Sequence, residues 1–329
     1  MQLVKPTPEE AEAGLRAMVM VARAPGAIAP PARALLDAAQ KVLLGTDHDV
    51  DRLDGITPQD LARALARPEI RRQLVQGMII VSMAAGEPPV VQSELVERFA
   101  GALEVETPAL RALRHLAGRD ILLYKLCVVR NGHLPDMIRD QYAHQGLMGV
   151  AKAVLGIKGL AEEPEVAARY HALERLPDDR LGKRLWHHYQ DNHFKFPGEK
   201  NGFPAAGVYH DVSHVLAGYN TTPEGETLVG AFSAGYREGR ADHGFFTLLF
   251  VVSIFSTGVD VTPINVGARE GTVGRIAPQF LEAIQRGAAI TTDLSNDWDF
   301  WPYLELPLED ARQRLRVQPK TGGHSWDYP

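Results

Sequence analysis

The 329-residue sequence lacks several features that would place it in a special class of proteins. It has a single cysteine, Cys127, within an apolar stretch, so no disulfide can form inside the chain and a reducing compartment is expected. Basic residues are not in excess, because 35 Lys and Arg stand against 41 Asp and Glu, for a net charge of −6. Nucleic-acid modules present a cationic face, so nucleic acid is not expected as a partner.

Long hydrophobic segments are also missing. The longest uncharged run, residues 244–259, has 16 residues and contains two glycines, whereas a membrane span needs about 20 apolar residues. The first twenty residues hold three glutamates and no continuous apolar stretch, unlike a secretory signal or a transit peptide. We therefore expect a cytoplasmic protein, with peripheral attachment to the inner membrane face as an option.

Signals for helices dominate what is present. A Thr-Pro pair suits an N-cap followed by the first helical position, and strand-like alternation is scarce. The pair recurs at Thr7-Pro8, Thr57-Pro58, Thr107-Pro108, Thr222-Pro223 and Thr262-Pro263. Apolar residues recur at helical spacing in 9–24, 33–44, 58–65, 69–83 and 92–103. The sequence predicts an all-α fold.

The chain divides into two predicted parts near Gly118. Residues 1–118 form a compact set of short helices, and residues 119–329 hold most of the histidines. The segment GMIIVSMAAGEPPVVQSELVERFAGAL resembles a helical module of the tellurite-resistance TerB type. A helical module without catalytic residues is expected to serve interaction or assembly, and the chemistry is expected in residues 119–329.

Two histidines four positions apart, His210 and His214, stand in the segment GVYHDVSHVLAGYNTTPEGETL. On a helix this spacing places both imidazoles on one face, about 40° apart and one turn removed. Asp211 is rotated by about 100° from His210, so it can bind the same metal or act as an outer-shell group. The spacing predicts a metal site with all three residues in one arc.

A tight helical hairpin is expected to bring a fourth donor to these residues. Gly218 should end the first helix, and Thr222 should cap the second. His214 then lies about one turn before the end of the first helix and Glu226 about one turn into the second, so the two are level. Two imidazoles and two carboxylates suit Zn²⁺ and also accept Fe²⁺ or Mn²⁺.

Ordinary explanations of these residues also exist. Histidine pairs at this spacing occur by chance, and the helix dipole favours acidic residues in any first helical turn. The HDxxH pattern differs from the HExxH of zinc proteases, and no third histidine follows at the spacing those enzymes use. No phosphate-binding loop, GxSxG elbow or dinucleotide fingerprint is present.

The pattern His-Asp-x-x-His, eleven residues and Glu resembles the signature of the Coq-four family of ubiquinone (coenzyme Q) biosynthesis proteins. The segment LERLPDDRLGKRLWHHYQDN resembles the family's helix entry, HVLAGYNTTPEGE its hairpin, and DWDFWPYLELPLEDARQRLRV its closing segment. The resemblance covers about residues 120–320. In this sequence the pattern falls on His210, Asp211, His214 and Glu226.

The resemblance implies an all-helical protein that holds a divalent metal, usually zinc, through those four side chains. It implies a role in removing the carboxyl group of a prenylated hydroxybenzoate-type ring, a step that needs dioxygen or another oxidant if it is oxidative. The implied partners are a prenylated quinone precursor or other isoprenoid lipid, a membrane surface and other quinone-biosynthesis proteins, and a homo-oligomer is left open. The chain resembles a bacterial member with an added N-terminal module.

A prenyl tail would need an apolar wall, although ordinary core packing is the commoner role of such residues. The candidates for this wall are Phe245, Phe246, Leu249 and Phe250. Arg237 follows Glu226 by eleven positions, near the same helical face, and is a candidate anchor for an anionic head group; a surface salt bridge is the commoner outcome. Of Trp186, His187 and His188, one side chain is expected to point inward and two outward.

Two classes of function use the same predicted residues. In the first, the protein is a metal-dependent enzyme of quinone-precursor metabolism. In the second, it is a non-catalytic lipid-binding scaffold that presents precursors to partner enzymes and holds a structural zinc. An open coordination position favours the enzyme, and a closed set of four ligands favours the scaffold.

Overall fold

The structure is a computed structural model of the chain. It describes residues 3–132, 135, 139, 162–202, 204–237, 242–261, 269–295 and 298–328. These residues form helices and loops with no β-strand among them, apart from two isolated bridges that join Arg180 to Pro307 and Tyr219 to Asp327. The predicted all-α fold is confirmed.

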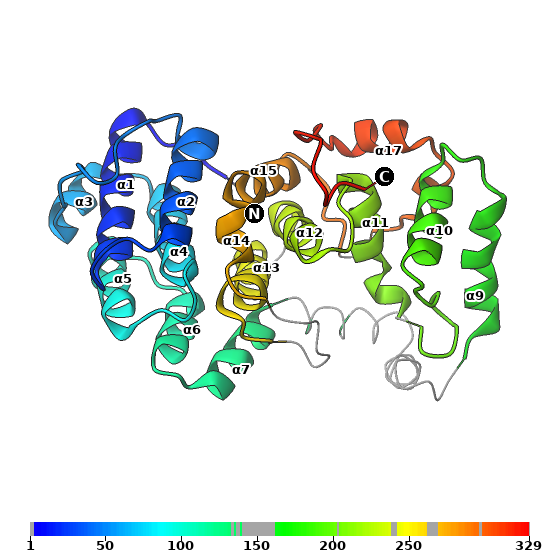
Figure 1. Ribbon diagram of the computed structural model, residues 1–329, viewed down its shortest axis with the longest axis horizontal. Coiled ribbons are helices and arrows are strands. Elements are labelled where there is room, and N and C mark those ends of the chain that lie inside the picture. Colours follow the sequence, from blue (N-terminus) through cyan, green and yellow to red (C-terminus); the bar gives the residue numbers. More distant parts are fainter. Residues whose placement is uncertain are drawn as a thin grey trace.

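The helices of the N-terminal part are mostly short. They are α1 (Pro8–Arg23), α2 (Pro30–Ala39), the π-helix η1 (Gln40–Leu44), α3 (Pro58–Ala64), α4 (Pro68–Met83), α5 (Val90–Ala102), α6 (Pro108–Ala117) and α7 (Ile121–Asn131). Helices α1 to α6 gather at one end of the molecule in Figure 1. Their bounds agree with the predicted segments to within a few residues, because the apolar spacing that defines them is local.

The remaining described helices follow after residue 161. They are α9 (Pro164–His171), η2 (Ala172–Arg175), α10 (Leu181–Asp191), η3 (Ala205–Gly207), α11 (Val208–Ala217), α12 (Pro223–Tyr236), α13 (His243–Val252), the π-helix η4 (Ser253–Thr257), α14 (Thr272–Arg275), α15 (Ala277–Ala288), α16 (Trp301–Leu304) and α17 (Leu308–Leu315). In Figure 1, α12 to α15 lie in the middle, with α9 and α10 at the end opposite the N-terminal helices.

The Thr-Pro pairs act as helix starts. In each of the four described pairs the threonine is the N-cap, and its hydroxyl accepts a hydrogen bond from a backbone N–H of the first turn. This bond satisfies one of the donors that a helix start leaves unpaired. The four N-caps are Thr7, Thr57, Thr107 and Thr222. The fifth pair, Thr262-Pro263, lies outside the described residues.

Helix α12 is the central element. It packs against α11, α13 and α15, and most of its residues are buried. Its contact with α15 is close because glycines face it: a Cβ on Gly287 would lie 2.0 Å from the carbonyl oxygen of Phe232. Packing on three sides fixes the axis of α12, and therefore the position of its first turn.

The N-terminal helices dock on this centre. Helix α2 packs against α14 and α15, and α4 packs against α13. The nearly buried carboxylate of Asp242, just before α13, joins the two parts: it accepts hydrogen bonds from Arg72 and Gln76 of α4 and from Thr107, each at 2.9 Å. Residues that are distant in sequence thus donate hydrogen bonds to the same carboxylate.

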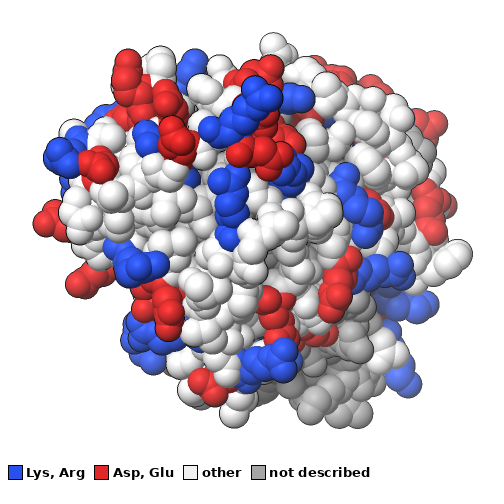
Figure 2. Space-filling view, turned by 60° about the vertical axis from the view of Figure 1, so that its left-hand side comes forward, with Lys and Arg blue, Asp and Glu red and all other residues white. Residues whose placement is uncertain are grey.

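Among the helices of the described segments, none combines the length and the apolar character needed to cross a membrane. On the face drawn in Figure 2, acidic and basic side chains are intermingled over a largely uncharged surface.

Candidate metal centre

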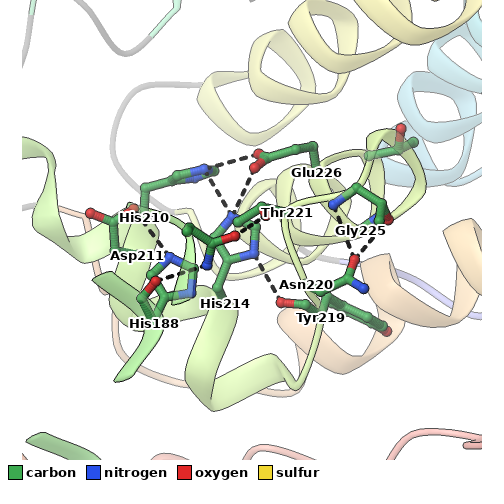
Figure 3. A network of polar contacts seen from close by, with 12 residues as sticks. His188, His210, Asp211, His214, Tyr219, Asn220, Thr221, Gly225 and Glu226 are labelled. Atoms are coloured by element: carbon green, nitrogen blue, oxygen red, sulfur yellow. Dashed lines mark hydrogen bonds and ion pairs between the residues drawn. The ribbon is translucent and has the colours of Figure 1, made fainter. Parts of the chain in front are cut away.

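Three of the four predicted ligands meet at one place, and we call them the His–Glu cluster: His210 and His214 of α11 and Glu226 of α12 (Figure 3). Their ligand atoms all lie within 4.8 Å of one another. The two Nε2 atoms are 3.2 Å apart, and the Glu226 carboxylate oxygens lie 3.3 Å from His210 Nε2 and 3.4 Å from His214 Nε2. The predicted level placement across the hairpin is confirmed.

These spacings fit a small divalent ion. In a tetrahedral zinc site with bonds of about 2.0–2.1 Å, neighbouring ligand atoms are separated by about 3.3 Å, which is close to all three distances in the cluster. One side of the cluster is open, because the side chains of His210 and Glu226 are 40% and 31% exposed. Three donors with an accessible side match the arrangement in which a fourth position stays free.

The ring of His214 is held in one orientation. Its side chain is 1% exposed, and its Nδ1 donates a hydrogen bond of 2.9 Å to the carbonyl oxygen of Tyr219. Metal-binding histidines commonly donate their second ring nitrogen in this way. With the proton on Nδ1, the Nε2 lone pair faces the carboxylate of Glu226 and the Nε2 of His210. These electron-rich atoms repel one another unless a cation lies between them, either an added proton or a metal ion.

The hairpin that builds the cluster follows from local sequence. Helix α11 ends at Gly218, whose φ of 76° lies in the left-handed region that favours glycine, and α12 begins after the N-cap Thr222. Gly225 is equally necessary, because a Cβ there would lie 2.0 Å from the carbonyl oxygen of Asn220 in the connecting loop. The loop therefore packs directly on the first turn of α12, which carries Glu226.

Asp211 is not brought into this cluster. Its Oδ2 accepts a hydrogen bond of 2.5 Å from the Tyr189 hydroxyl, and its Oδ1 lies 3.8 Å from Nε2 of His188. The ring of His188 in turn stacks on that of His214 at 5.2 Å. In this geometry Asp211 reaches the cluster only through its neighbours, which is the outer-shell alternative of the two roles predicted for it.

Burial and charge shift the pKa values of the cluster in opposite senses. Burial alone would raise the pKa of Glu226, but the imidazoles of His214 and His210 outweigh it and hold this pKa far below its usual range. Burial alone would lower the pKa of His214, but the Glu226 carboxylate dominates and raises it. The two groups therefore favour an imidazolium and carboxylate pair when no metal is bound.

The pKa values of Asp211 and of the groups around it are shifted as well. Burial raises the pKa of Tyr189, and the Asp211 carboxylate raises it further. Burial would also raise the pKa of Asp211, but contacts with His188 and His210 lower it. Burial is the largest effect on His188 and lowers its pKa. Asp211 is thus held as a carboxylate, with a neutral phenol beside it.

The predicted substrate-binding residues lie mainly in the core. Phe245, Phe246 and Leu249 are buried and Phe250 is partly buried, so these side chains of α13 pack mainly against the rest of the protein. Phe245 lines an apolar cavity whose walls include none of the three cluster residues. A contact between these side chains and a substrate stays a prediction.

Arg237 is not at the surface, so the expected surface salt bridge is wrong. It is 4% exposed, and its guanidinium donates to the hydroxyls of Ser295, Thr247 and Tyr209 at 3.1, 2.6 and 3.1 Å. It stands about 16 Å along α12 from Glu226, because eleven residues separate them. A role in binding an anionic head group stays a prediction.

The sequence did not single out several residues that support the cluster. Tyr189, Tyr219 and Gly225 each contact a cluster residue, Asp211 or the connecting loop. Of the three residues 186–188, His188 is the inward one, fully buried, while Trp186 and His187 are partly exposed, as predicted. Only Gly225 carried a readable signal, since a glycine within a first helical turn costs stability unless space requires it.

Comparison with known proteins leaves the family open. No protein-family model matches this chain, and no curated protein does. Among solved structures, the chain is similar to a crystal structure of a candidate ubiquinone biosynthesis protein from Nostoc punctiforme, with 16% sequence identity and a TM-score of 0.31 over 76% of this chain and 99% of that chain. A similarity at this level does not assign fold or function.

Proposed function

We propose that this chain is a metal-dependent protein of ubiquinone or other prenylquinone biosynthesis that assists loss of the carboxyl group from a prenylated hydroxybenzoate-type ring. The observation that carries the proposal is the convergence of His210, His214 and Glu226 at spacings of 3.2–3.4 Å. The surrounding pattern, which resembles the Coq-four signature, supports the choice of substrate class.

The residues of the cluster fit a divalent ion, with zinc the first choice and iron or manganese also suited to two imidazoles and a carboxylate. When bound there, such an ion supplies a Lewis acid that favours negative charge on a phenolate or carboxylate ligand. His214 is the fixed member of the set, since Tyr219 holds its ring. His210 and Glu226 border the open side, where a substrate would approach.

The buried pair of Tyr189 and Asp211 has a separate task in this proposal. The carboxylate of Asp211 keeps its charge, and it accepts a hydrogen bond of 2.5 Å from the Tyr189 hydroxyl. Because Asp211 directly follows His210, this hydrogen bond also limits the movement of the first turn of α11. Asp211 and Tyr189 therefore position His210 instead of contacting the ring of the substrate.

Metal analysis of protein purified without chelator tests the site. We expect about one divalent ion per chain in the wild type and loss of the ion in His214→Ala and Glu226→Ala. Glu224→Ala is the matched control, because Glu224 lies in the same helical turn but pairs with Arg275. Unchanged metal content in both cluster variants would overturn the proposal.

Turnover separates the enzyme from the scaffold. A prenylated 4-hydroxybenzoate labelled in its carboxyl carbon should release labelled carbon dioxide with the metal-loaded wild type, and Glu226→Ala should release none. Binding of this compound without release of carbon dioxide, in the presence of dioxygen as well, would contradict the enzymatic role and leave the lipid-presenting scaffold. The open side of the cluster favours the enzyme.

A further inference from the structure

The apolar cavity that Phe245 lines lies where the N-terminal helices meet the centre, and we call it the seam cavity. Its volume is about 150 Å³, and its walls come from α1, α2, η1 and α4 on one side and from α13 and α15 on the other. The three residues of the His–Glu cluster are not among the residues that line it. The seam cavity is therefore a site of its own.

The buried part of the seam cavity is lined by hydrocarbon side chains. Leu15, Leu35, Ile80, Phe245 and Phe280 line it, and each is nearly or fully buried. These residues come from α1, α2, α4, α13 and α15, so each of these five helices contributes an apolar side chain to the cavity. Such a surface offers dispersion contacts and no hydrogen bonds.

The polar residues at the walls already have partners inside the protein. Gln73 exchanges two hydrogen bonds with the backbone of Val4, at 2.8 and 3.0 Å, and Gln76 donates to Asp242. The carboxylate of Glu10 accepts from the backbone N–H of Thr7 at 2.8 Å and pairs with Arg67. A water in the cavity would need two to four polar partners, so an apolar molecule is the better occupant.

The cavity is only partly enclosed, and leucines are among its partly buried lining residues. Leu3, Leu43 and Leu44 line it and are only partly buried. The two leucines at 43 and 44 belong to η1, whose π-helical winding ends at Gly45. Short π-helical turns inside helices often occur at functional sites, because the changed winding moves side chains off the regular helix face.

We propose that the seam cavity binds the end of a neutral hydrocarbon chain. An apolar cavity of about 150 Å³ is known to stay dry and to accept a molecule the size of benzene, so about six carbons fit inside. The rest of the chain leaves past Leu3, Leu43 and Leu44. This inference does not rest on the metal site, and an occupant would touch both the N-terminal helices and the central ones.

Thermal unfolding with named probes tests the proposal. We expect 1-octanol and farnesol, which are neutral chains of different kinds, to raise the melting temperature in a concentration-dependent way, because a ligand of the folded state stabilises it. A result in which toluene raises the melting temperature and both chain alcohols do not would overturn the proposal in favour of a compact ring. No effect of any probe would also overturn it.

A matched pair of variants on α4 locates the binding. Val81→Phe places a larger side chain on the cavity wall and should abolish the octanol effect, whereas Val75→Phe makes the same change at a buried position outside the cavity and should keep it. An octanol effect that survives in Val81→Phe contradicts the proposal. Ala11→Phe repeats the test from the opposite wall.

A readout on the unmodified chain avoids any failure of a variant to fold. In methyl NMR spectra, octanol should shift the signals of Ile80 and Ile284, which line the cavity, and leave Ile254, which is buried elsewhere. The reverse pattern would exclude this site. His214→Ala should retain the octanol response. A failure of the metal-site proposal can therefore be distinguished from a failure of the seam-cavity proposal.

Discussion

At Gly225 a single methyl group would collide with the loop of the hairpin that carries the His–Glu cluster, since the nearest atom, the Asn220 carbonyl oxygen, would be 2.0 Å away. We expect Gly225→Ala to lower the melting temperature and to weaken metal binding by about 10- to 100-fold, the range seen when groups that orient metal ligands are lost. Calorimetric titration with Zn²⁺ measures the second effect.

The control for this change is Gly101→Ala in α5, where an added Cβ would meet nothing within 4 Å. Alanine is the better helix former, so this variant should gain up to about 1 kcal/mol of stability. Its metal affinity should equal that of the wild type. Equal stability of the two variants would show that the close contact at Gly225 is absent in solution.

The charges of the cluster predict a pH dependence of stability in the metal-free protein. The raised pKa of His214 means that its pairing with Glu226 is fully present below the ordinary histidine pKa of about 6.5 and is lost as the pH rises through the higher folded value. The free energy of unfolding of the wild type should therefore exceed that of Glu226→Gln by about 1 kcal/mol more at pH 6 than at pH 8.5, which urea unfolding at the two pH values measures.

Glu224→Gln is the control for this measurement, because its partner is an arginine that keeps its charge over the whole range. Its difference from the wild type should be the same at both pH values. A difference for Glu226→Gln that is also constant would contradict the paired state of the two residues. Comparing the variant with the wild type removes the opposite contribution of His188, whose pKa is lowered mainly by burial.

At the scale of the helix, the N-cap of α12 stabilises the start of the helix and also the turn that carries Glu226. The hydroxyl of Thr222 accepts a hydrogen bond of 3.2 Å from the backbone N–H of Gly225, one residue before Glu226. We expect Thr222→Ala to cost about 1 kcal/mol of stability and to reduce metal affinity, since the first turn of α12 then frays. Urea unfolding and metal titration give the two numbers.

The same substitution elsewhere separates the two effects. Thr57 caps α3 with the same Thr-Pro pair, and its hydroxyl accepts from Asp60 at 3.1 Å. Thr57→Ala should lose about as much stability as Thr222→Ala and no metal affinity. If both variants bind metal equally, the cap of α12 does not position Glu226.

At the scale of the whole molecule, Asp242 holds the two parts of the chain together. It is 5% exposed and accepts from Arg72, Gln76 and Thr107. We expect Asp242→Ala to lower the free energy of unfolding by about 2–3 kcal/mol, because charged hydrogen bonds are lost and the remaining groups stay partly buried. Asn at this position keeps an acceptor and tolerates the φ of 76°, so Asp242→Asn should lose less.

Urea unfolding followed separately by signals from the N-terminal helices and from α12 checks this. In the wild type both should report one transition, and in Asp242→Ala the N-terminal signal should move to lower urea. Asp60→Asn is the control, because the carboxylate of Asp60 contacts exposed Arg63 and the neighbouring Thr57 hydroxyl, both within the same part of the chain, and the change should move neither transition. Coincident transitions in Asp242→Ala would mean that apolar packing alone couples the parts.

Local signals account for most of what could be predicted. The N-caps, the stop at Gly218 and the four-residue spacing of His210 and His214 act within one or two helical turns, where backbone geometry leaves few alternatives. The hairpin then brings Glu226 level with His214, so three of the predicted ligands could be placed without knowledge of the rest of the chain.

The sequence by itself therefore determined the helices, their ends and the core of the His–Glu cluster, because these depend on hydrogen bonds and rotations between near neighbours. Only the tertiary structure decided which residues meet across long separations, such as Tyr189 with Asp211 and Arg237 with the hydroxyl of Ser295. It also decided that Leu15 and Phe280 line the same cavity. Such contacts follow from how whole helices pack, and any apolar face can in principle cover several others.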